Sequence, residues 1–166
     1  TVDLPLLRYP SMSAGASDLL SIPGIDSKQC VAVMFTSGST GTPQPHLKTW
    51  GALIRCVRAE AVQLDLPTAC TVIGTVPPQH MFGFESTVMM PWHNRNALSH
   101  ALPFYPADIC QALAAVPAPR VLISSPVHLR ALLDAELALP QIARVVSATA
   151  PLSDQLARDI EARFNT

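Results

Sequence analysis

Short apolar runs alternate along the chain with stretches in which apolar residues recur at helical spacing. A continuous apolar run predicts a strand at 31–35, mainly apolar segments predict strands at 71–76 and 121–123, and weaker patterns predict short strands at 98–102 and 145–146. The run at 31–35 contains no polar residue, which is typical of a strand that is covered on both faces in a parallel sheet.

Helical periodicity follows most of these strands. The first helix is expected to begin at Trp50, with Thr49 as its N-cap, and a second is expected to run through Met90. Ser125 and Ser153 each precede a further helix. The apolar face of the helix after Ser125 is Leu129, Leu132, Leu133 and Leu137, and that of the helix after Ser153 is Leu156, Ile160 and Phe164.

This alternation predicts an α/β fold with a mainly parallel, doubly wound sheet and helices on both faces. Segment 1–28 is irregular and interrupted by Pro and Gly, so we expect an approach segment there. Over 29–166 we expect an α/β unit that is one compact domain or a piece of a larger one. Sheets of this kind bind ligands at the carboxyl ends of their strands. The loops richest in Gly, Ser, Thr, Pro and His follow predicted strands and begin at Thr36, Pro77, Ser124 and Ser147. We therefore expect these loops to meet at one edge of the sheet and to form one site.

The composition excludes several classes of function. Among 166 residues, 11 are Lys or Arg and 12 are Asp or Glu, and no basic block is present that would hold a nucleic-acid backbone. No apolar run is long enough to span a bilayer. The cysteines form no Cys-x-x-Cys pair, and His and acidic residues do not recur at the spacing of metal ligands, so no metal site is expected. The sequence has neither a signal peptide nor a disulfide-like cysteine pattern, which favours a cytoplasmic location.

A loop dense in Gly, Ser and Thr follows the first predicted strand, from Thr36 to Pro43. Gly38 and Gly41 permit positive φ and close approach of the backbone, so that successive N–H groups can converge on anionic oxygens. Further donors are the hydroxyl groups of Ser37, Ser39, Thr40 and Thr42. The loop is neither a Walker A motif nor a nucleophile elbow. It predicts a polyphosphate site, and the alternative is a plain connector between a strand and a helix.

The loop from Thr36 to Pro43 resembles the phosphate-binding signature of the adenylate-forming superfamily. This superfamily comprises acyl- and aryl-CoA synthetases, adenylation domains of nonribosomal peptide synthetases, and firefly luciferase. Two further segments resemble family motifs in the same order. Segment 78–83 is similar to the Pro-x-x-His-x-x-Gly segment, and 147–152 is similar to a Gly-Ala-Ala-Pro-Leu turn that packs against adenine. The resemblance covers roughly residues 28–164, the central part of the family's large N-terminal domain.

The resemblance implies three groups of site residues. The loop over 36–42 would bind the phosphates of ATP, and His80, Phe82 and Gly83 would lie at the acyl or thiol pocket. The residues that would contact adenine are Ser147, Ala148, Thr149, Ala150 and Pro151.

The chain departs from the family pattern directly after the phosphate loop. The family usually continues Pro-Lys-Gly, whereas this chain has Pro43, Gln44 and Pro45. Gln44 carries no charge, and Pro45 removes a backbone donor. We predict that Lys48 supplies the absent cation; the alternative is that it is a solvated residue before the helix.

By resemblance, the parent enzyme would use ATP with Mg²⁺ to convert a carboxylic acid into an acyl-adenylate. It would then transfer the acyl group to coenzyme A or to the phosphopantetheine of an acyl carrier protein. Other segments of the family, including the lysine that drives adenylation, have no match up to Phe164. We therefore assign no catalytic residue, and we expect the chain to be an excised piece that is inactive alone.

Two further readings concern the segment after the loop. An alternative to the enzyme hypothesis is that the protein is a non-catalytic nucleotide-binding module, whose phosphate loop has degenerated at Gln44 and Pro45. The continuation over 44–50 is also similar to ligases of bacterial aryl-polyene pigment or fatty-acyl pathways. That similarity implies an aromatic or medium-chain acid and a carrier protein as acceptor.

Overall fold

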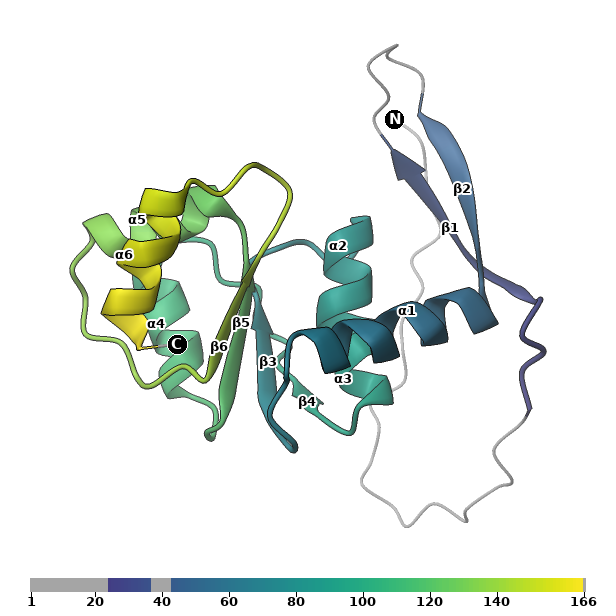
Figure 1. Cartoon of the computed structure of the whole chain (residues 1–166), viewed down its shortest axis with the longest axis horizontal. Coiled ribbons are helices and arrows are strands. Elements are labelled where there is room, and N and C mark those ends of the chain that lie inside the picture. The colour runs from purple at the N-terminus through teal and green to yellow at the C-terminus, as the bar shows by residue number, and fades with distance from the viewer. Residues whose placement is uncertain (1–23, 37–42, 166) are drawn as a thin grey trace, which may run out of the picture.

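The computed structural model describes residues 24–36 and 43–165, which form a mixed α/β fold (Figure 1). Its main sheet is parallel throughout and has the strand order β4-β3-β5-β6. The strands are β3 at Thr71–Gly74, β4 at Ala97–Leu98, β5 at Arg120–Ser124 and β6 at Arg144–Ser147. The prediction of an α/β fold with a parallel sheet is therefore confirmed.

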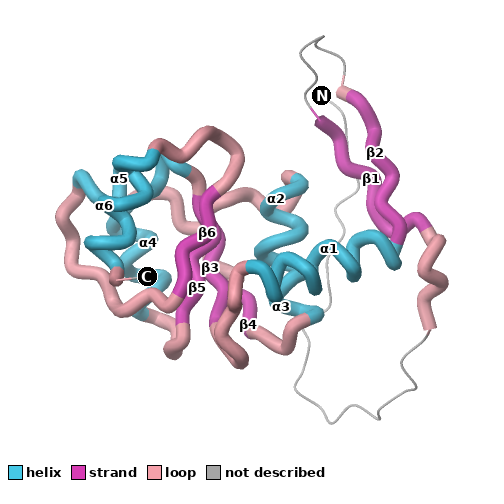
Figure 2. Tube along the Cα trace, in the orientation of Figure 1, coloured by secondary structure: helices cyan, strands magenta, loops and turns pink. Residues whose placement is uncertain are grey.

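Helices cover both faces of this sheet (Figure 2). One layer contains α1 (Trp50–Gln63), α2 (Met81–Gly83), the π-helical segment η1 (Phe84–Met89) and α3 (Met90–His93). The other contains α4 (Pro106–Ala114), α5 (Pro126–Asp134) and α6 (Asp154–Phe164). Successive side chains of a strand point to opposite faces, so the neighbours Leu122 and Ile123 of β5 belong to separate apolar clusters. This double coverage explains why the central strands β3 and β5 have mostly apolar sequences.

Two strands outside the parallel sheet form an antiparallel hairpin, β1 (Cys30–Thr36) and β2 (Gln44–Thr49). The prediction that the run at 31–35 is covered on both faces in the parallel sheet is therefore wrong. A parallel crossover needs a dozen or more residues, and the connection between β1 and β2 is shorter than that. In the hairpin, Phe35 is 65% exposed and Leu47 is 71% exposed. An apolar run alone does not distinguish a covered strand from an exposed one.

The hairpin continues directly into α1, because β2 ends at Thr49 and α1 begins at Trp50. Two backbone hydrogen bonds hold this junction. The N–H of Trp50 donates to the carbonyl of Gln29, and the N–H of Gly51 donates to the carbonyl of Ser27, each at 2.9 Å. Figure 1 shows the hairpin projecting from this end of α1, apart from the parallel sheet.

Helices α1, α5 and α6 begin where the sequence predicts, but only one of their three predicted caps forms a capping bond among the described residues. The Ser153 hydroxyl accepts a 3.3 Å hydrogen bond from the N–H of Leu156 in α6. Thr49 and Ser125 have extended N-cap backbones without a capping bond. Leu137 lies beyond the end of α5 and is 37% exposed, so the predicted apolar face does not extend to it.

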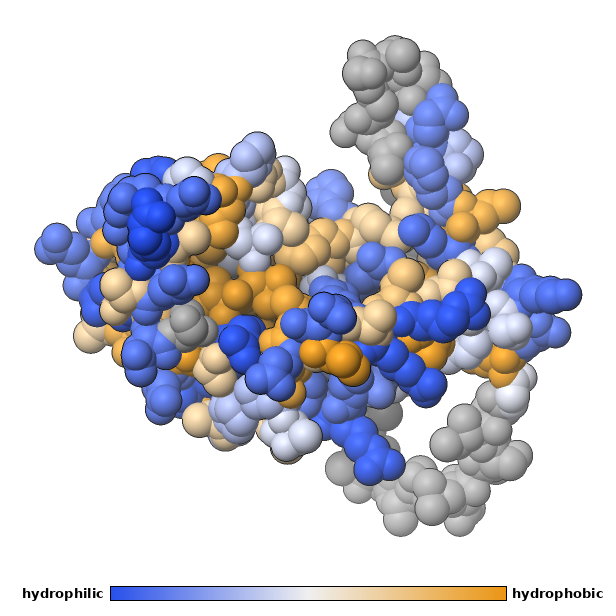
Figure 3. All heavy atoms as spheres, viewed as in Figure 1, coloured by the Kyte–Doolittle hydropathy of each residue, from blue (hydrophilic) through white to orange (hydrophobic). Residues whose placement is uncertain are grey.

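The outer edge of β6 has no further strand within the part of the chain that the structure describes. All four residues of β6 are half-buried, whereas those of β3 are buried. Figure 3 shows hydrophobic residues at the surface over this side of the sheet.

A carboxyl group is half-buried between α1 and η1. The Ser86 hydroxyl donates a 2.6 Å hydrogen bond to Oε1 of Glu60. Burial raises the pKa of Glu60 above its ordinary value of 4.5; the Ser86 bond opposes this rise, and nearby Glu85 adds to it. The folded state therefore binds this proton more tightly than the unfolded chain, so the contribution of Glu60 to stability falls as pH rises from the ordinary pKa through the raised one.

Glu60→Gln is expected to raise the free energy of unfolding at neutral pH and to flatten its fall above the ordinary glutamate pKa. The neutral amide keeps an oxygen that accepts from Ser86, and no charge has to be desolvated. Thermal unfolding of the complete protein from acid to neutral pH measures the effect. The control is Glu136→Gln at an exposed carboxyl. A Glu60→Gln variant that is less stable at neutral pH would contradict this account.

Candidate functional site

A cavity of about 780 Å³ opens at the carboxyl edge of the parallel sheet. The hairpin, the segment after β3, the start of α5 and the loop after β6 all contribute to it. Its lining residues are Phe35, Pro43, Thr75, Val76, Pro77, His80, Met81, Phe82, Gly83, Ser125, His128 and Thr149. Among these described residues there is no Asp, Glu, Lys or Arg. The wall is therefore mostly apolar, with a few neutral polar groups, as is usual for small-molecule sites.

The place of the cavity follows from the strand order. The chain passes from β3 to β4 on one side and then crosses to β5 on the other side of β3, so the order reverses between β3 and β5. Doubly wound sheets bind ligands in the crevice at such a reversal. Here the hydroxyls of Thr75 and Ser124 are buried and lie 2.8 Å apart, and the N–H of Thr75 donates to the Ile123 carbonyl at 2.9 Å. These bonds hold the two strand exits together at the edge of the cavity.

The segment after β3 brings all three residues predicted for the acyl or thiol pocket to the cavity wall. His80 is the extended N-cap of α2, and its N–H donates to the Pro77 carbonyl at 3.1 Å. Gly83 packs so closely on the same loop that a Cβ placed on it would overlap the Pro77 carbonyl oxygen. A glycine is therefore needed for α2 to fold back against Pro77 and present His80 and Phe82 to the cavity.

The loop after β6 reaches the cavity through only one of the residues predicted to contact adenine. Thr149, at φ 78°, is among the lining residues. Ala150 and Pro151 line a separate hollow beside α5. The N–H of Ala148 donates to the Ser124 carbonyl at 3.3 Å, which ties this loop to the exit of β5. The Ser147 hydroxyl is buried without a hydrogen-bond partner among the described residues.

The predicted phosphate loop begins at the end of the hairpin strand β1. Thr36 is the last residue of β1, and Ser37, Gly38, Ser39, Thr40, Gly41 and Thr42 lie outside the described residues. The residues on either side of the loop, Phe35 and Pro43, line the cavity. Of the four loops expected at one edge, three follow strands of the parallel sheet, whereas the one that begins at Thr36 follows the hairpin strand β1.

Lys48 lies in β2 opposite Ala32, half-buried, and is not among the residues that line the cavity. The departure from the family pattern at Gln44 and Pro45 falls at the start of the same strand. Gln44 pairs with Thr36, and Pro45 pairs with Phe35, where proline offers no N–H to the ladder.

The cavity also contains a histidine that the sequence analysis did not assign to a site. His128, in the first turn of α5, forms a 2.8 Å hydrogen bond through Nδ1 with the Ser125 hydroxyl. The ring of Phe104 meets it edge-on at 5.1 Å between centroids. Burial lowers the pKa of His128. The signal in the sequence is the spacing of three between an N-cap serine and a histidine, directly after a predicted strand.

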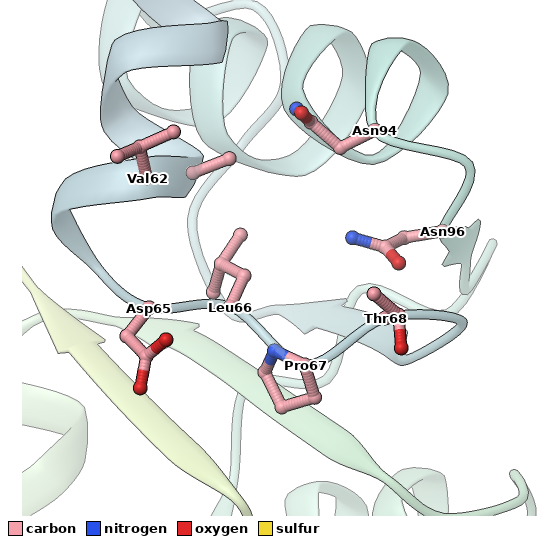
Figure 4. A pocket seen from close by; sticks show the side chains of 8 residues that line it. Val62, Asp65, Leu66, Pro67, Thr68, Asn94 and Asn96 are labelled. Atoms are coloured by element: carbon pink, nitrogen blue, oxygen red, sulfur yellow. The ribbon is translucent and has the colours of Figure 1, made fainter.

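A second hollow, of about 350 Å³, lies at the opposite edge of the sheet, where β3 and β4 begin (Figure 4). Its amide side chains are already engaged in the fold. Asn96 Oδ1 accepts from the N–H of Cys70 at 3.2 Å, and Asn94 Nδ2 donates to the Met90 carbonyl at 2.7 Å. The carboxylate of Asp65 pairs with Arg144 at 3.4 Å. The Asn96 and Asp65 contacts tie the segments before β4 and after α1 to the sheet, so these side chains serve the fold.

Within 24–36 and 43–165, no helix combines the length and apolar character needed to cross a membrane. Over those ranges, His, Cys, Asp and Glu side chains do not gather in groups of three that could hold a metal ion.

Comparisons with known proteins give the family. The model of the family described as AMP-binding enzyme matches residues 8–166. A 4-coumarate–CoA ligase of Rhodobacter capsulatus is 38% identical in an alignment of 132 residues, which covers 78% of this chain and 33% of that protein. A second 4-coumarate–CoA ligase, of Halorhodospira halophila, is 39% identical in an alignment of 108 residues, which covers 63% of this chain and 25% of that protein. The chain thus spans a third or less of the length of these relatives.

Solved structures agree with the fold. The O-succinylbenzoate coenzyme A synthetase of Bacillus subtilis, in complex with AMP, has a TM-score of 0.75 at 16% identity, covering 91% of this chain and 31% of its own. At this identity the likeness concerns the fold alone. Together with the match of the family model over 8–166, it leads to one conclusion: the chain belongs to the AMP-binding enzyme family.

Proposed function

We propose that the complete protein carrying this chain uses ATP to convert a carboxylic acid into an acyl-adenylate and then passes the acyl group to coenzyme A. The observation that carries this proposal is the cavity at the strand reversal. It is lined by His80 and Thr149 from two of the three family-like segments, by Pro43, the last residue of the third, and by Phe35, which precedes that segment. The family match supports adenylation.

In this proposal each segment binds one part of the substrates. The loop over 36–42, with Lys48, holds the phosphates. The loop over 147–151 takes the adenine, while His80, Phe82 and Gly83 bound the acid. The acid carboxylate attacks the α-phosphorus and pyrophosphate leaves; the thiol then attacks the acyl carbon and AMP leaves. The chain contributes by positioning these groups.

Mg²⁺ would enter this site with ATP. The described wall of the cavity contains no carboxylate, so it offers no acidic cage of its own. Mg²⁺ prefers hard oxygen ligands and is commonly held through substrate phosphates. We therefore propose that the ATP phosphates supply most of its ligands and that the ion neutralises their charge.

The acid is proposed to be aromatic. The two curated relatives are named 4-coumarate–CoA ligases, and Phe35 and Phe82 contribute aromatic surface to an otherwise largely apolar wall. A medium-chain acid, or a carrier protein as acceptor, is the competing version of the same function.

Acid-dependent exchange of pyrophosphate into ATP tests the proposal in the complete protein. Exchange with cinnamic or benzoic acids and not with fatty or amino acids is the expected result. Acyl transfer to coenzyme A, compared with transfer to phosphopantetheinylated carrier protein, then identifies the acceptor. ATP binding without exchange for any acid would replace this proposal by the non-catalytic nucleotide-binding module.

Lys48→Ala is expected to weaken ATP binding by about 10-fold or more, because a hydrogen bond to a charged group contributes about 1.5–3 kcal/mol. The matched control is Lys28→Ala; Lys28 is exposed and precedes the hairpin. Calorimetric titration with ATP compares the two variants. Equal ATP affinity in both would show that Lys48 is a solvated residue of β2.

A further inference from the structure

The cavity wall contains a polar pair that none of the family-like segments includes. Ser125 precedes α5 with an extended backbone, and its hydroxyl bonds Nδ1 of His128 at 2.8 Å instead of capping the helix. Both residues line the cavity. An N-cap hydroxyl usually bonds a backbone N–H of the first turn. Here the hydroxyl bonds the imidazole one turn along the helix instead, and this bond fixes the orientation of the ring.

The imidazole is held from a second side, and its surroundings favour the uncharged form. Phe104 meets it edge-on, with an interplanar angle of 89°. Burial lowers the pKa of His128, which favours the neutral ring. A neutral imidazole has one donor and one acceptor nitrogen, so Nδ1 is engaged with Ser125 and Nε2 keeps the complementary role.

The surroundings of the pair narrow the chemistry of its ligand. The wall elsewhere is largely apolar, with Val76, Met81 and Phe82 among its members, and no described lining residue is an acid, a lysine or an arginine. A neutral polar group in such a wall recognises an uncharged ligand group that forms hydrogen bonds. A hydroxyl fits best, because it donates or accepts and so complements either tautomer of His128.

The position of the pair also indicates which substrate it meets. In the sheet order, the exit of β5 lies between the exit of β3, which carries His80, and the exit of β6, which carries Thr149. Building on the proposed function, we propose that Ser125 and His128 form a specificity-determining pair for a ring hydroxyl of an aromatic carboxylic acid. His128 makes the contact and Ser125 is its positioning residue.

Steady-state kinetics of the complete protein with 4-hydroxycinnamate and with cinnamate test this pair, because the two acids differ only in the hydroxyl. His128→Phe is expected to lower kcat/KM for 4-hydroxycinnamate by about 10-fold and to change kcat/KM for cinnamate by no more than about twofold. Ser125→Ala is expected to lower the preference for the hydroxylated acid by a smaller factor than His128→Phe does. His128→Gln, whose amide nitrogen can reach the position of Nε2, is expected to restore part of it.

The control is His100→Phe, at an exposed histidine outside the cavity. It should leave the ratio of kcat/KM for 4-hydroxycinnamate to kcat/KM for cinnamate unchanged. An equal loss for both acids in His128→Phe, or a wild-type protein without preference for the hydroxylated acid, overturns the pair's role. If the wild type exchanges pyrophosphate with cinnamate but not with 4-hydroxycinnamate, the proposed adenylation stands and only the role of the pair is lost. Absence of pyrophosphate exchange with every acid in the wild type removes the proposed function, and the recognition role falls with it.

Discussion

Leu122→Ala is expected to lower the free energy of unfolding by about 2–5 kcal/mol, the usual range for truncating a large buried side chain. Leu122 is fully buried in β5, between the neighbouring strands β3 and β6, and packs with Ile73 and Ile142 on the side of α4 to α6. Strands on both sides limit how far the site can collapse around the cavity that the substitution leaves. Urea unfolding of the complete protein measures the loss.

Leu137→Ala provides the matched control, because the same side chain is removed where it is 37% exposed. This control is expected to lose less than about 1 kcal/mol, since only part of the side chain leaves water on folding. Similar losses at both positions would mean that β5 is not the centre of the sheet.

Gly83→Ala is expected to reduce pyrophosphate exchange by at least about 10-fold, equivalent to about 1.4 kcal/mol of transition-state stabilisation. The added Cβ would overlap the Pro77 carbonyl oxygen and lie 2.7 Å from its carbon. Both neighbours are backbone atoms, so α2 must shift away from the loop. The shift would move His80 and Phe82 in the cavity wall, and a displacement of about 1 Å costs on the order of 10²-fold in rate where catalysis depends on positioning.

Gly24→Ala is the control for Gly83→Ala, because a Cβ at Gly24 would meet nothing within 4 Å. Circular dichroism and thermal unfolding separate local displacement from loss of the fold. If Gly83→Ala exchanges pyrophosphate at the wild-type rate, this would show that α2 can shift away from Pro77 without disturbing the site.

The central strands β3 and β5 were predictable from the sequence because each is covered on both faces. Val72 and Ile73, or Leu122 and Ile123, pack into clusters on opposite sides, so both positions must be apolar. The position of the candidate site at the carboxyl edge was predictable for a second reason. Polar loops that follow parallel strands meet at one edge of the sheet. This argument located the exits of β3, β5 and β6.

The hairpin was not predictable from the same signals. Strand β2 includes Gln44, Pro45 and Lys48, and its pattern resembles a loop; pairing with β1 makes it a strand. Strand propensity depends strongly on such neighbours. The place of His128 depends likewise on Phe104, which lies in a separate segment of the chain. The helix expected through Met90 contains the π-helical segment η1, and apolar periodicity does not report a change of helical type.

The uninterrupted passage from β2 into α1 couples the position of the hairpin to the packing of the helix on the sheet. Helix α1 packs through Leu53 and Val57 in the apolar cluster that includes Val121. The seven residues of β1 span about 20 Å, so a tilt of the hairpin by about 5° would displace the far end of β1 by nearly 2 Å. A small repacking beneath α1 would thereby move the end of β1 at which the segment that we propose for the phosphates begins.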